Sequence, residues 1–239
     1  MVCTLEFDET RYELKPAAAW IRGYAREHSL PGLDPELVQM PLEVLTDGEL
    51  ASIVAVGEAA GLKLYPFKTG KTELPRVRQV LSFLRGVEPE SLLDVGSGRG
   101  VFLLPFLEAF PQTHVTSVDI LDKRVCFLKE LSAGGYSQLS ALKGDICNQP
   151  FPDNCFDVVT LLEVLEHIPE VGKAVKSAVK MAKRYVVVSV PFKPDDNPEH
   201  IHLLTKDILT ELFHDAGCTK LHFGGVNGHL ILVAGKENG

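Results

Sequence analysis

The chain has 239 residues, of which 45% are hydrophobic, so it can bury a large core as one domain or as one domain with an appendage. It carries 24 basic and 32 acidic residues, and the formal net charge is −8. No basic surplus is present to neutralise a phosphate backbone or an anionic membrane. This charge balance argues against nonspecific binding to nucleic acid.

The cysteine pattern and the lengths of the apolar stretches indicate the cellular compartment of the protein. The five cysteines are scattered without a C-x-x-C pair, a pattern that fits neither a disulfide framework nor a cysteine zinc site. The first residues, Met1 to Glu13, are charged where a signal peptide would be apolar. No later stretch approaches the roughly 20 apolar residues that span a bilayer. We therefore expect a soluble cytoplasmic protein with no membrane partner, and the oligomeric state is left open.

Two kinds of periodicity divide the chain. Apolar residues recur at helical intervals from Lys15 to Leu64, and a turn-like stretch at 65–70 separates them from an amphipathic segment, Leu74 to Leu84. Short apolar runs then alternate with helical patterns, which predicts a parallel sheet covered on both faces, an α/β fold. The expected strands are 92–95, 115–118, 158–162 and 186–190, the expected helices are 101–109, 122–131, 170–183 and 205–216, and a hairpin at 221–234 turns at Asn227-Gly228.

A glycine-rich turn follows the first of these strands. The sequence D-V-G-S-G-R-G at 94–100 places a glycine at every second position between an apolar strand and a helix start. Glycine there permits positive φ and lets a ligand approach bare backbone, while the helix start offers unpaired N–H groups. These features are typical of a site for a dinucleotide or for S-adenosylmethionine (SAM).

Spacing and acids favour SAM over a dinucleotide. A dinucleotide fingerprint has G-x-G-x-x-G, whereas this turn has G-x-G-x-G preceded by Asp94, which would repel a pyrophosphate but can accept from an ammonium group. Asp119 ends the next expected strand and can accept from ribose hydroxyls in either kind of cofactor. Asp145 lies in K-G-D-I at 143–146, at the end of a further strand expected between 115–118 and 158–162, and is a candidate acceptor for an adenine amino group.

These motifs together resemble the class I SAM-dependent methyltransferases, from about residue 75 to residue 239. The resemblance implies a Rossmann-like, seven-stranded, mostly parallel sheet with helices on both faces and a C-terminal antiparallel hairpin, with SAM across the strand ends. It implies that the turn binds the methionine end, Asp119 the ribose, and Asp145 with Ile146 the adenine. The expected cofactor-binding residues are Asp94, Gly96, Ser97, Gly98, Gly100, Asp119, Ile120, Asp145, Ile146 and Glu163.

A cluster of acids and histidines follows the expected strand 158–162. In E-V-L-E-H-I-P, helical spacing would bring Glu163, Glu166 and His167 to one face, and His200 lies in a later H-x-H segment at the same sheet edge. Carboxylates and imidazoles suit a divalent ion such as magnesium or manganese. The arrangement resembles the small-RNA 2′-O-methyltransferases and the ubiquinone-pathway O-methyltransferases, which implies that Glu163, Glu166, His167 and His200 are metal ligands. It also resembles metal-free methyltransferases, in which His167 or His200 would act as general base and Glu163 would contact the cofactor.

The N-terminal region is expected to be a helical extension or lid, residues 1–74, attached to a methyltransferase domain, residues 75–239. By analogy with the family it would lie over the cofactor, with Trp20, Tyr65 and Phe67 either as walls of an acceptor pocket or as ordinary core.

The resulting hypothesis is transfer of a methyl group from SAM to an oxygen, less favourably a nitrogen, of a small or medium-sized acceptor. The catalytic candidates are His167, His200 and Glu163. The alternatives are a metal-dependent RNA 2′-O-methyltransferase, disfavoured by the net charge, a noncatalytic SAM-binding regulatory subunit, and a nicotinamide-dependent oxidoreductase, disfavoured by the glycine spacing.

Overall fold

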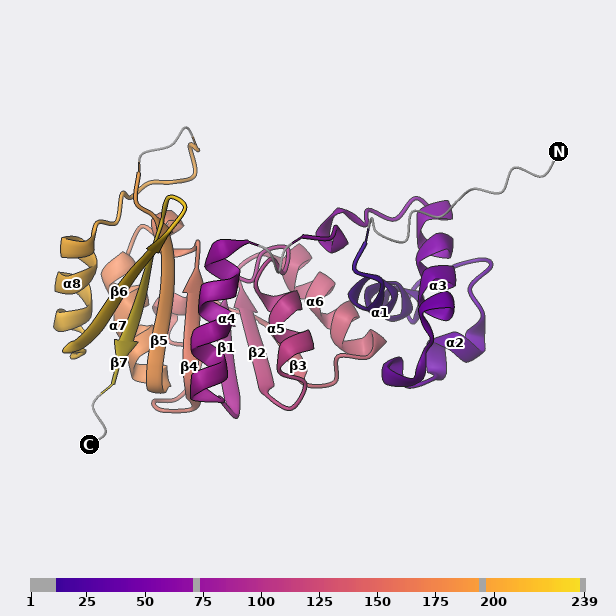
Figure 1. Ribbon diagram of the computed structural model, residues 1–239, viewed down its shortest axis with the longest axis horizontal. Helices are drawn as coiled ribbons and strands as arrows, with labels where there is room; N and C mark the ends of the chain where they lie inside the picture. Colours follow the sequence, from indigo (N-terminus) through magenta and orange to yellow (C-terminus); the bar gives the residue numbers. More distant parts are fainter. Residues whose placement is uncertain (1–11, 71–73, 194–196, 237–239) are drawn as a thin grey trace.

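The computed structural model describes residues 12–70, 74–193 and 197–236 (Figure 1). Cys3, most of the charged N-terminal segment and part of the loop before Glu199 lie outside the described residues. Among the described residues, no helix combines the length and apolar character that crossing a bilayer requires.

A seven-stranded sheet forms the centre of the molecule, with strand order β3-β2-β1-β4-β5-β7-β6. Neighbouring strands from β3 to β5 run parallel, whereas β7 is antiparallel to both β5 and β6. The prediction of a mostly parallel sheet with a C-terminal hairpin is confirmed. The strands are β1 (Ser91–Val95), β2 (His114–Asp119), β3 (Leu139–Lys143), β4 (Phe156–Leu162), β5 (Ala182–Pro191), β6 (Lys220–Val226) and β7 (His229–Gly235).

Helices cover both faces of this sheet, as the continuous apolar strands predicted. Consecutive residues of β1 point to opposite faces, so Leu92 and Leu93 belong to two different hydrophobic clusters. The first cluster includes α4, α5 and α6, and the second includes α7 and α8. The helices are α1 (Leu14–Ala25), α2 (Pro35–Gln39), α3 (Asp47–Ala59), α4 (Pro75–Val87), α5 (Leu103–Ala109), α6 (Asp122–Gly134), α7 (Val171–Met181) and α8 (Lys206–Asp215), with short 3₁₀ turns η1 (Leu42–Val44), η2 (Tyr65–Phe67), η4 (Ile146–Asn148) and η5 (Leu165–His167).

Local sequence signals account for several helix starts. Thr46 and Glu49 form a capping box at the start of α3, and Pro75 occupies the first turn of α4. The Thr205 hydroxyl accepts from the N–H of Ile208, so Thr205 is the N-cap of α8.

Asp157 ties β1 to β4 at the end of the sheet opposite the glycine turn. Its carboxylate accepts from the backbone N–H groups of Glu90 and Ser91 and from the Lys183 ammonium group. Burial by itself would raise the pKa of Asp157, but the two N–H donors and Lys183 together hold this pKa below its ordinary value. Asp157 therefore stabilises the sheet.

The N-terminal helices pack beside the β3 edge of the sheet and not over the strand ends (Figure 1). The α1 helix lies against α6, where Trp20 donates to Glu130 at 2.6 Å and its ring contacts Phe67 and Phe127. Phe67 is completely buried, and Trp20 is partly buried and packs against the same hydrophobic cluster. The expected position of the N-terminal helices over the cofactor differs from the observed one.

Candidate active site

The glycine turn begins where β1 ends, and its glycines serve two purposes. Gly96 and Gly98 adopt φ angles of 65° and 58°, a region that disfavours residues with a side chain. A Cβ on Gly96 would meet the Val164 side chain at 2.9 Å, whereas the nearest atom to a Cβ on Gly98 is 3.8 Å away. Gly96 therefore permits close packing, Gly100 likewise packs against Leu104, and Gly98 leaves the backbone open to a ligand.

Asp94 lies beneath this turn and is only 2% exposed. Thr160 donates to one of its oxygens at 2.6 Å and Ser97 donates to the other, while the Ser97 hydroxyl also contacts that of Ser117. Burial raises the pKa of Asp94 to about 6, although both hydroxyl hydrogen bonds act in the opposite direction. Asp94 and Ser97 thus fix the turn and also line a hollow beside it.

A cleft of about 680 Å³ runs along the carboxyl ends of β1 to β4. Asp119 binds the Leu121 N–H through one carboxylate oxygen, Asp145 caps η4, and Ile120 is 63% exposed although it is apolar. The structure therefore brings together most of the predicted cofactor residues. Those that line the cleft are Gly96, Gly98, Asp119, Ile120, Asp145, Ile146 and Glu163.

Glu163 stands where this cleft meets the second hollow, which has a volume of about 240 Å³. Its backbone is left-handed, with φ 58°, so it does not continue into the helical turn that the E-V-L-E-H spacing predicted. Its carboxylate accepts from the Ser189 hydroxyl and lies 3.0 Å from Nε2 of His229. With both nitrogens protonated, His229 would pair with Glu163 and also donate to the Asn227 carbonyl, 3.3 Å from Nδ1.

The sequence alone did not indicate His229 or Ser189 as site residues. Ser189 of β5 reaches Glu163 through the parallel pairing of β5 with β4, and His229 of β7 reaches it through the antiparallel pairing of β7 with β5. The Asn-Gly turn was visible in the sequence, and it sets His229 at the first position of the final strand.

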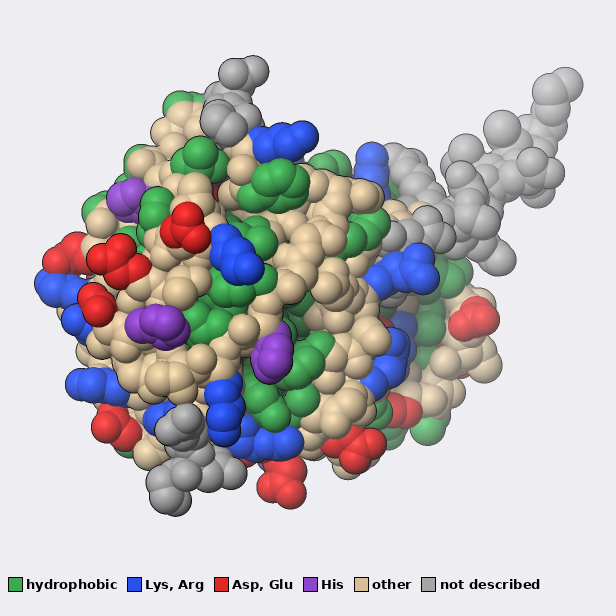
Figure 2. Space-filling model, turned by 60° about the vertical axis from the view of Figure 1, so that its left-hand side comes forward, with side chains coloured by type: hydrophobic (Ala, Val, Ile, Leu, Met, Phe, Trp, Pro, Cys, Tyr) green, Lys and Arg blue, Asp and Glu red, His purple; other side chains and the backbone are tan. Residues whose placement is uncertain are grey.

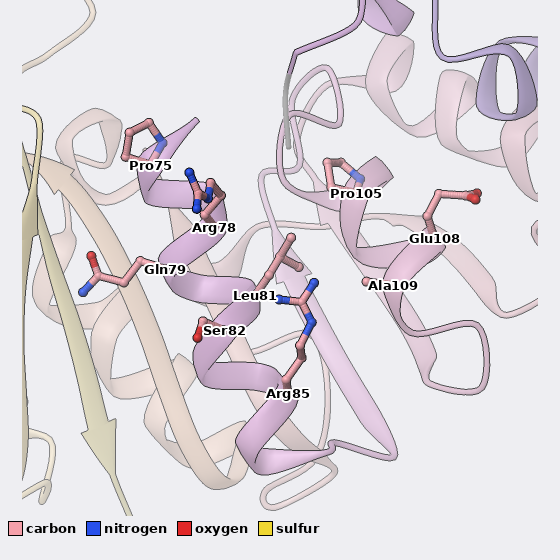
Figure 3. A pocket seen from close by; sticks show the side chains of 9 residues that line it. All are labelled: Pro75, Arg78, Gln79, Leu81, Ser82, Arg85, Pro105, Glu108 and Ala109. Carbon is pink, nitrogen blue, oxygen red and sulfur yellow. The ribbon is translucent and has the colours of Figure 1, made fainter. Parts of the chain in front are cut away.

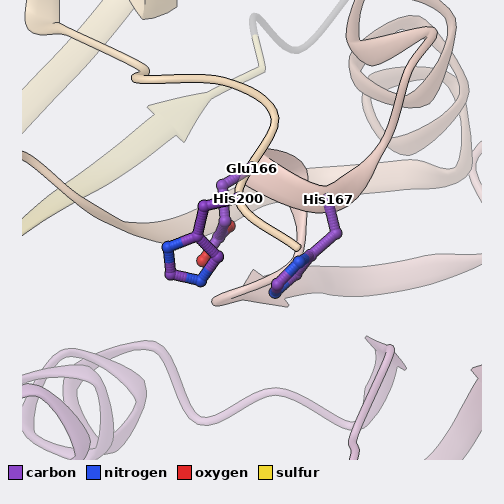
Figure 4. Close-up of side chains that lie close together, drawn as sticks. All are labelled: Glu166, His167 and His200. Atoms are coloured by element: carbon purple, nitrogen blue, oxygen red, sulfur yellow. The ribbon is translucent and has the colours of Figure 1, made fainter. Parts of the chain in front are cut away.

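Three of the four predicted metal ligands lie together in the structure, and the fourth lies apart from them. Donor atoms of Glu166, His167 and His200 all lie within 4.8 Å of one another, and the three side chains project into the same space (Figure 4). Glu166 is 1% exposed, and His167 has Nδ1 2.8 Å from the Glu199 carbonyl. Glu163 lies outside this group because its carboxylate is directed at His229 and Ser189.

The glycine turn, the ordered acids and the sheet order agree with a comparison to known families. Residues 93–188 match a family model described as a methyltransferase domain. This part of the chain is a methyltransferase domain, and the sheet shares the fold of solved SAM-dependent methyltransferases.

Curated relatives of the methyltransferase domain act on different kinds of acceptor, according to their names. A ribosomal RNA small subunit methyltransferase G from Levilactobacillus brevis is 54% identical over 46 residues, 19% of each chain. A demethylmenaquinone methyltransferase from Bacillus licheniformis is 27% identical over 118 residues, 49% of each chain. A ubiquinone biosynthesis O-methyltransferase from Pseudomonas fluorescens is 30% identical over 102 residues, 41% of this chain and 42% of the relative. The chain thus spans less than half the length of these relatives.

A solved structure shares the fold of the methyltransferase domain. The magnesium protoporphyrin IX methyltransferase from Synechocystis PCC 6803, with bound S-adenosylhomocysteine (SAH), superposes with a TM-score of 0.55 at 19% identity. The match covers 68% of this chain and 82% of that structure. At this identity the similarity concerns the fold.

A further groove of about 740 Å³ lies between α4 and α5 (Figure 3). It is lined by the outer side of α4, including Arg78 and Arg85, and by Glu108 of α5. It includes none of the predicted cofactor or catalytic residues, so its size does not make it the active site of the methyltransferase domain.

Proposed function

We propose that the protein transfers a methyl group from SAM to an oxygen of a small or medium-sized acceptor. The observation that carries the proposal is the continuity of the strand-end cleft, with its glycine turn and two acids, and the hollow beside Glu163. The cleft offers room and donors for a cofactor, and Glu163 stands at the boundary where an acceptor would approach it.

The residues of the cleft fit SAM by their chemistry. Asp119 has a carboxylate oxygen beyond the one that binds Leu121, and a ribose hydroxyl can donate to it. The exposed Ile120 offers an apolar surface to a flat ring, and the open backbone at Gly98 accommodates the methionine end. When bound, SAM supplies an activated methyl group on a sulfonium.

The chain's own contribution is alignment and proton removal. Ser189 and His229 fix the Glu163 carboxylate, which makes Glu163 a candidate proton acceptor for a hydroxyl group in the hollow. In the absence of a bound cation, His167 is the second candidate, because a proton on Nδ1 donates to the Glu199 carbonyl and leaves the Nε2 lone pair available. His200 lies beside it, with ring centroids 4.8 Å apart.

An oxygen acceptor is favoured by the Pseudomonas relative and by the carboxylate and imidazoles, which suit deprotonation of a hydroxyl. The Levilactobacillus relative supports an RNA acceptor instead. On the face shown in Figure 2, however, lysine and arginine side chains alternate with aspartate and glutamate. A continuous basic surface of the kind that follows a phosphate backbone is not seen among the residues coloured there.

Calorimetric titration of SAM, SAH and NAD tests the cofactor assignment. We expect SAM and SAH to bind and NAD not to bind. We expect Asp119→Ala to weaken the affinity for SAM by roughly 10- to 100-fold, because a charge-assisted hydrogen bond to the ribose is lost. Asp122→Ala is the matched control, since Asp122 is exposed and pairs with Lys143. Binding of NAD without SAM would refute the proposal, and SAM binding without methyl transfer to any hydroxylated acceptor would favour a regulatory subunit.

We further propose that Glu166, His167 and His200 bind a divalent cation, magnesium or manganese, which would lower the pKa of an acceptor hydroxyl. We expect manganese to bind the wild type with one site per chain. We expect Glu166→Gln to weaken the affinity for manganese at least about tenfold, because the charged ligand is lost. Glu170→Gln is the control, since Glu170 is exposed and pairs with Lys173. If wild-type and Glu166→Gln proteins bind manganese equally, and a chelator leaves methyl transfer unchanged, the metal proposal fails.

A further inference from the structure

Three arginines line the hollow next to Glu163. Arg76 comes from α4, Arg99 from the glycine turn and Arg124 from α6, so elements distant in the sequence bring guanidinium groups to one small space. Arg124 also lines the strand-end cleft and therefore lies where the two hollows join. The apolar walls are formed by Val77, Val80, Val101, Phe102 and Leu162, and the other polar side chains that line the hollow are Asp94, Ser97, Glu163 and Ser189.

The two acids of this hollow have hydrogen-bond partners other than the arginines. Asp94 is bound by the Ser97 and Thr160 hydroxyls, and Glu163 is bound by Ser189 and His229. Within the described part of the chain, Arg76, Arg99 and Arg124 form no ion pair with a carboxylate.

Arg99 is held in place by an aromatic ring. Its guanidinium lies over the exposed Tyr65 ring, 5.0 Å from the centroid, a contact between charge and ring face that leaves the N–H donors available. Lys68 lies 5.4 Å from the same ring and adds positive charge to this rim. An acid-rich chain thus concentrates cationic donors beside its candidate reaction centre.

The three guanidiniums exceed the number that the cofactor alone can neutralise. Bound SAM brings one carboxylate, which one guanidinium can satisfy, together with two positive charges on its sulfonium and ammonium groups. At least two guanidiniums then remain, and the local charge is more positive than before. A planar guanidinium binds carboxylates and phosphates through paired N–H donors.

We propose that the methyl acceptor carries an oxyanion, a carboxylate or a phosphate monoester, on an apolar or aromatic body, and that the Arg76, Arg99 and Arg124 hollow binds it. This inference rests on the proposed function, because it places the acceptor beside bound cofactor. The oxyanion would orient the acceptor so that its hydroxyl group faces Glu163.

The test is calorimetry with the SAH-loaded protein and paired probes, benzoate against benzamide and phenyl phosphate against phenol. We expect one acid to bind about tenfold or more tightly than its neutral partner, because two charge-assisted contacts are gained. The acid that shows the preference identifies the oxyanion as carboxylate or phosphate. Arg76→Gln, Arg99→Gln and Arg124→Gln are measured singly, and at least two of them should lose the preference while retaining SAH binding.

Arg78→Gln is the matched control, since Arg78 lies two residues from Arg76 on α4 but faces the outer groove (Figure 3). The inference is overturned if neither acid binds better than its neutral partner, if the preference survives in all three variants, or if Arg78→Gln abolishes it equally. SAH binding is measured first. Failure to bind SAH would contradict the proposed function, whereas SAH binding without a preference for either acid would contradict only the proposal that the acceptor carries an oxyanion.

Discussion

Asp94 combines burial with a position next to the proposed cofactor site. Its pKa, raised to about 6 mainly by burial, lies above the 3.8 of an ordinary aspartate. Between these two values the folded chain holds a proton that the unfolded chain releases, so the unliganded fold loses stability as the pH rises through this window. Above about pH 6 the carboxylate is ionised, and a cationic group in the adjoining hollow would stabilise it.

We therefore predict that SAH affinity falls as the pH decreases from 7 to 5, by up to about tenfold per unit below the Asp94 pKa, because the ligand's ammonium group needs the ionised carboxylate. Calorimetry across this range measures the dependence. Asp94→Asn should bind SAH weakly and with little pH dependence, whereas Asp145→Asn, at an exposed carboxyl, should retain the wild-type profile. A flat wild-type profile would show that Asp94 only holds the turn.

The contact between α1 and α6 depends on glycines that allow the two backbones to touch. A Cβ on Gly134 would lie 1.6 Å from the Ala19 carbonyl oxygen, and a Cβ on Gly23 would lie 1.7 Å from that of Glu130. We predict that Gly134→Ala lowers the free energy of unfolding by roughly 1–3 kcal/mol, because the helices must separate. A Cβ on Gly86 in α4 would have no neighbouring atom within 4 Å. We therefore expect Gly86→Ala to raise the free energy of unfolding slightly, by roughly 0.5–1 kcal/mol. Chemical denaturation compares the two, and equal effects would contradict the packing argument.

The same elements show how far the sequence could predict the structure. The β1 strand and its glycine turn were predictable because an apolar run, an acid and the alternate glycines are adjacent in the chain. The position of α1 was not, because periodicity identifies a helix but not the surface on which it packs. The orientation of the Glu163 side chain was also not predictable. Its partners Ser189 and His229 are 26 and 66 residues away, and only strand pairing brings them close to it.

At the scale of the whole molecule, the N-terminal helices and one face of the sheet share a single hydrophobic cluster. Ile21 of α1, Ile53 of α3 and Leu128 of α6 belong to the same cluster as Leu92 and Val115 of the sheet. The division between an extension and a methyltransferase domain at residue 74 stays a prediction. The shared core argues that both parts unfold together.

Trp20 reports on this coupling because it is the only tryptophan of the chain and lies between α1 and α6. We predict that denaturation followed by Trp20 fluorescence coincides with that followed by far-ultraviolet circular dichroism. SAH at 100 times its dissociation constant should stabilise both transitions by about 2.7 kcal/mol, although the cofactor cleft contains no residue of α1 to α3. NAD, which should not bind, is the control ligand. A separate Trp20 transition that SAH leaves unchanged would show that the N-terminal helices form an independent unit, and the shared cluster would then not couple them to the active site.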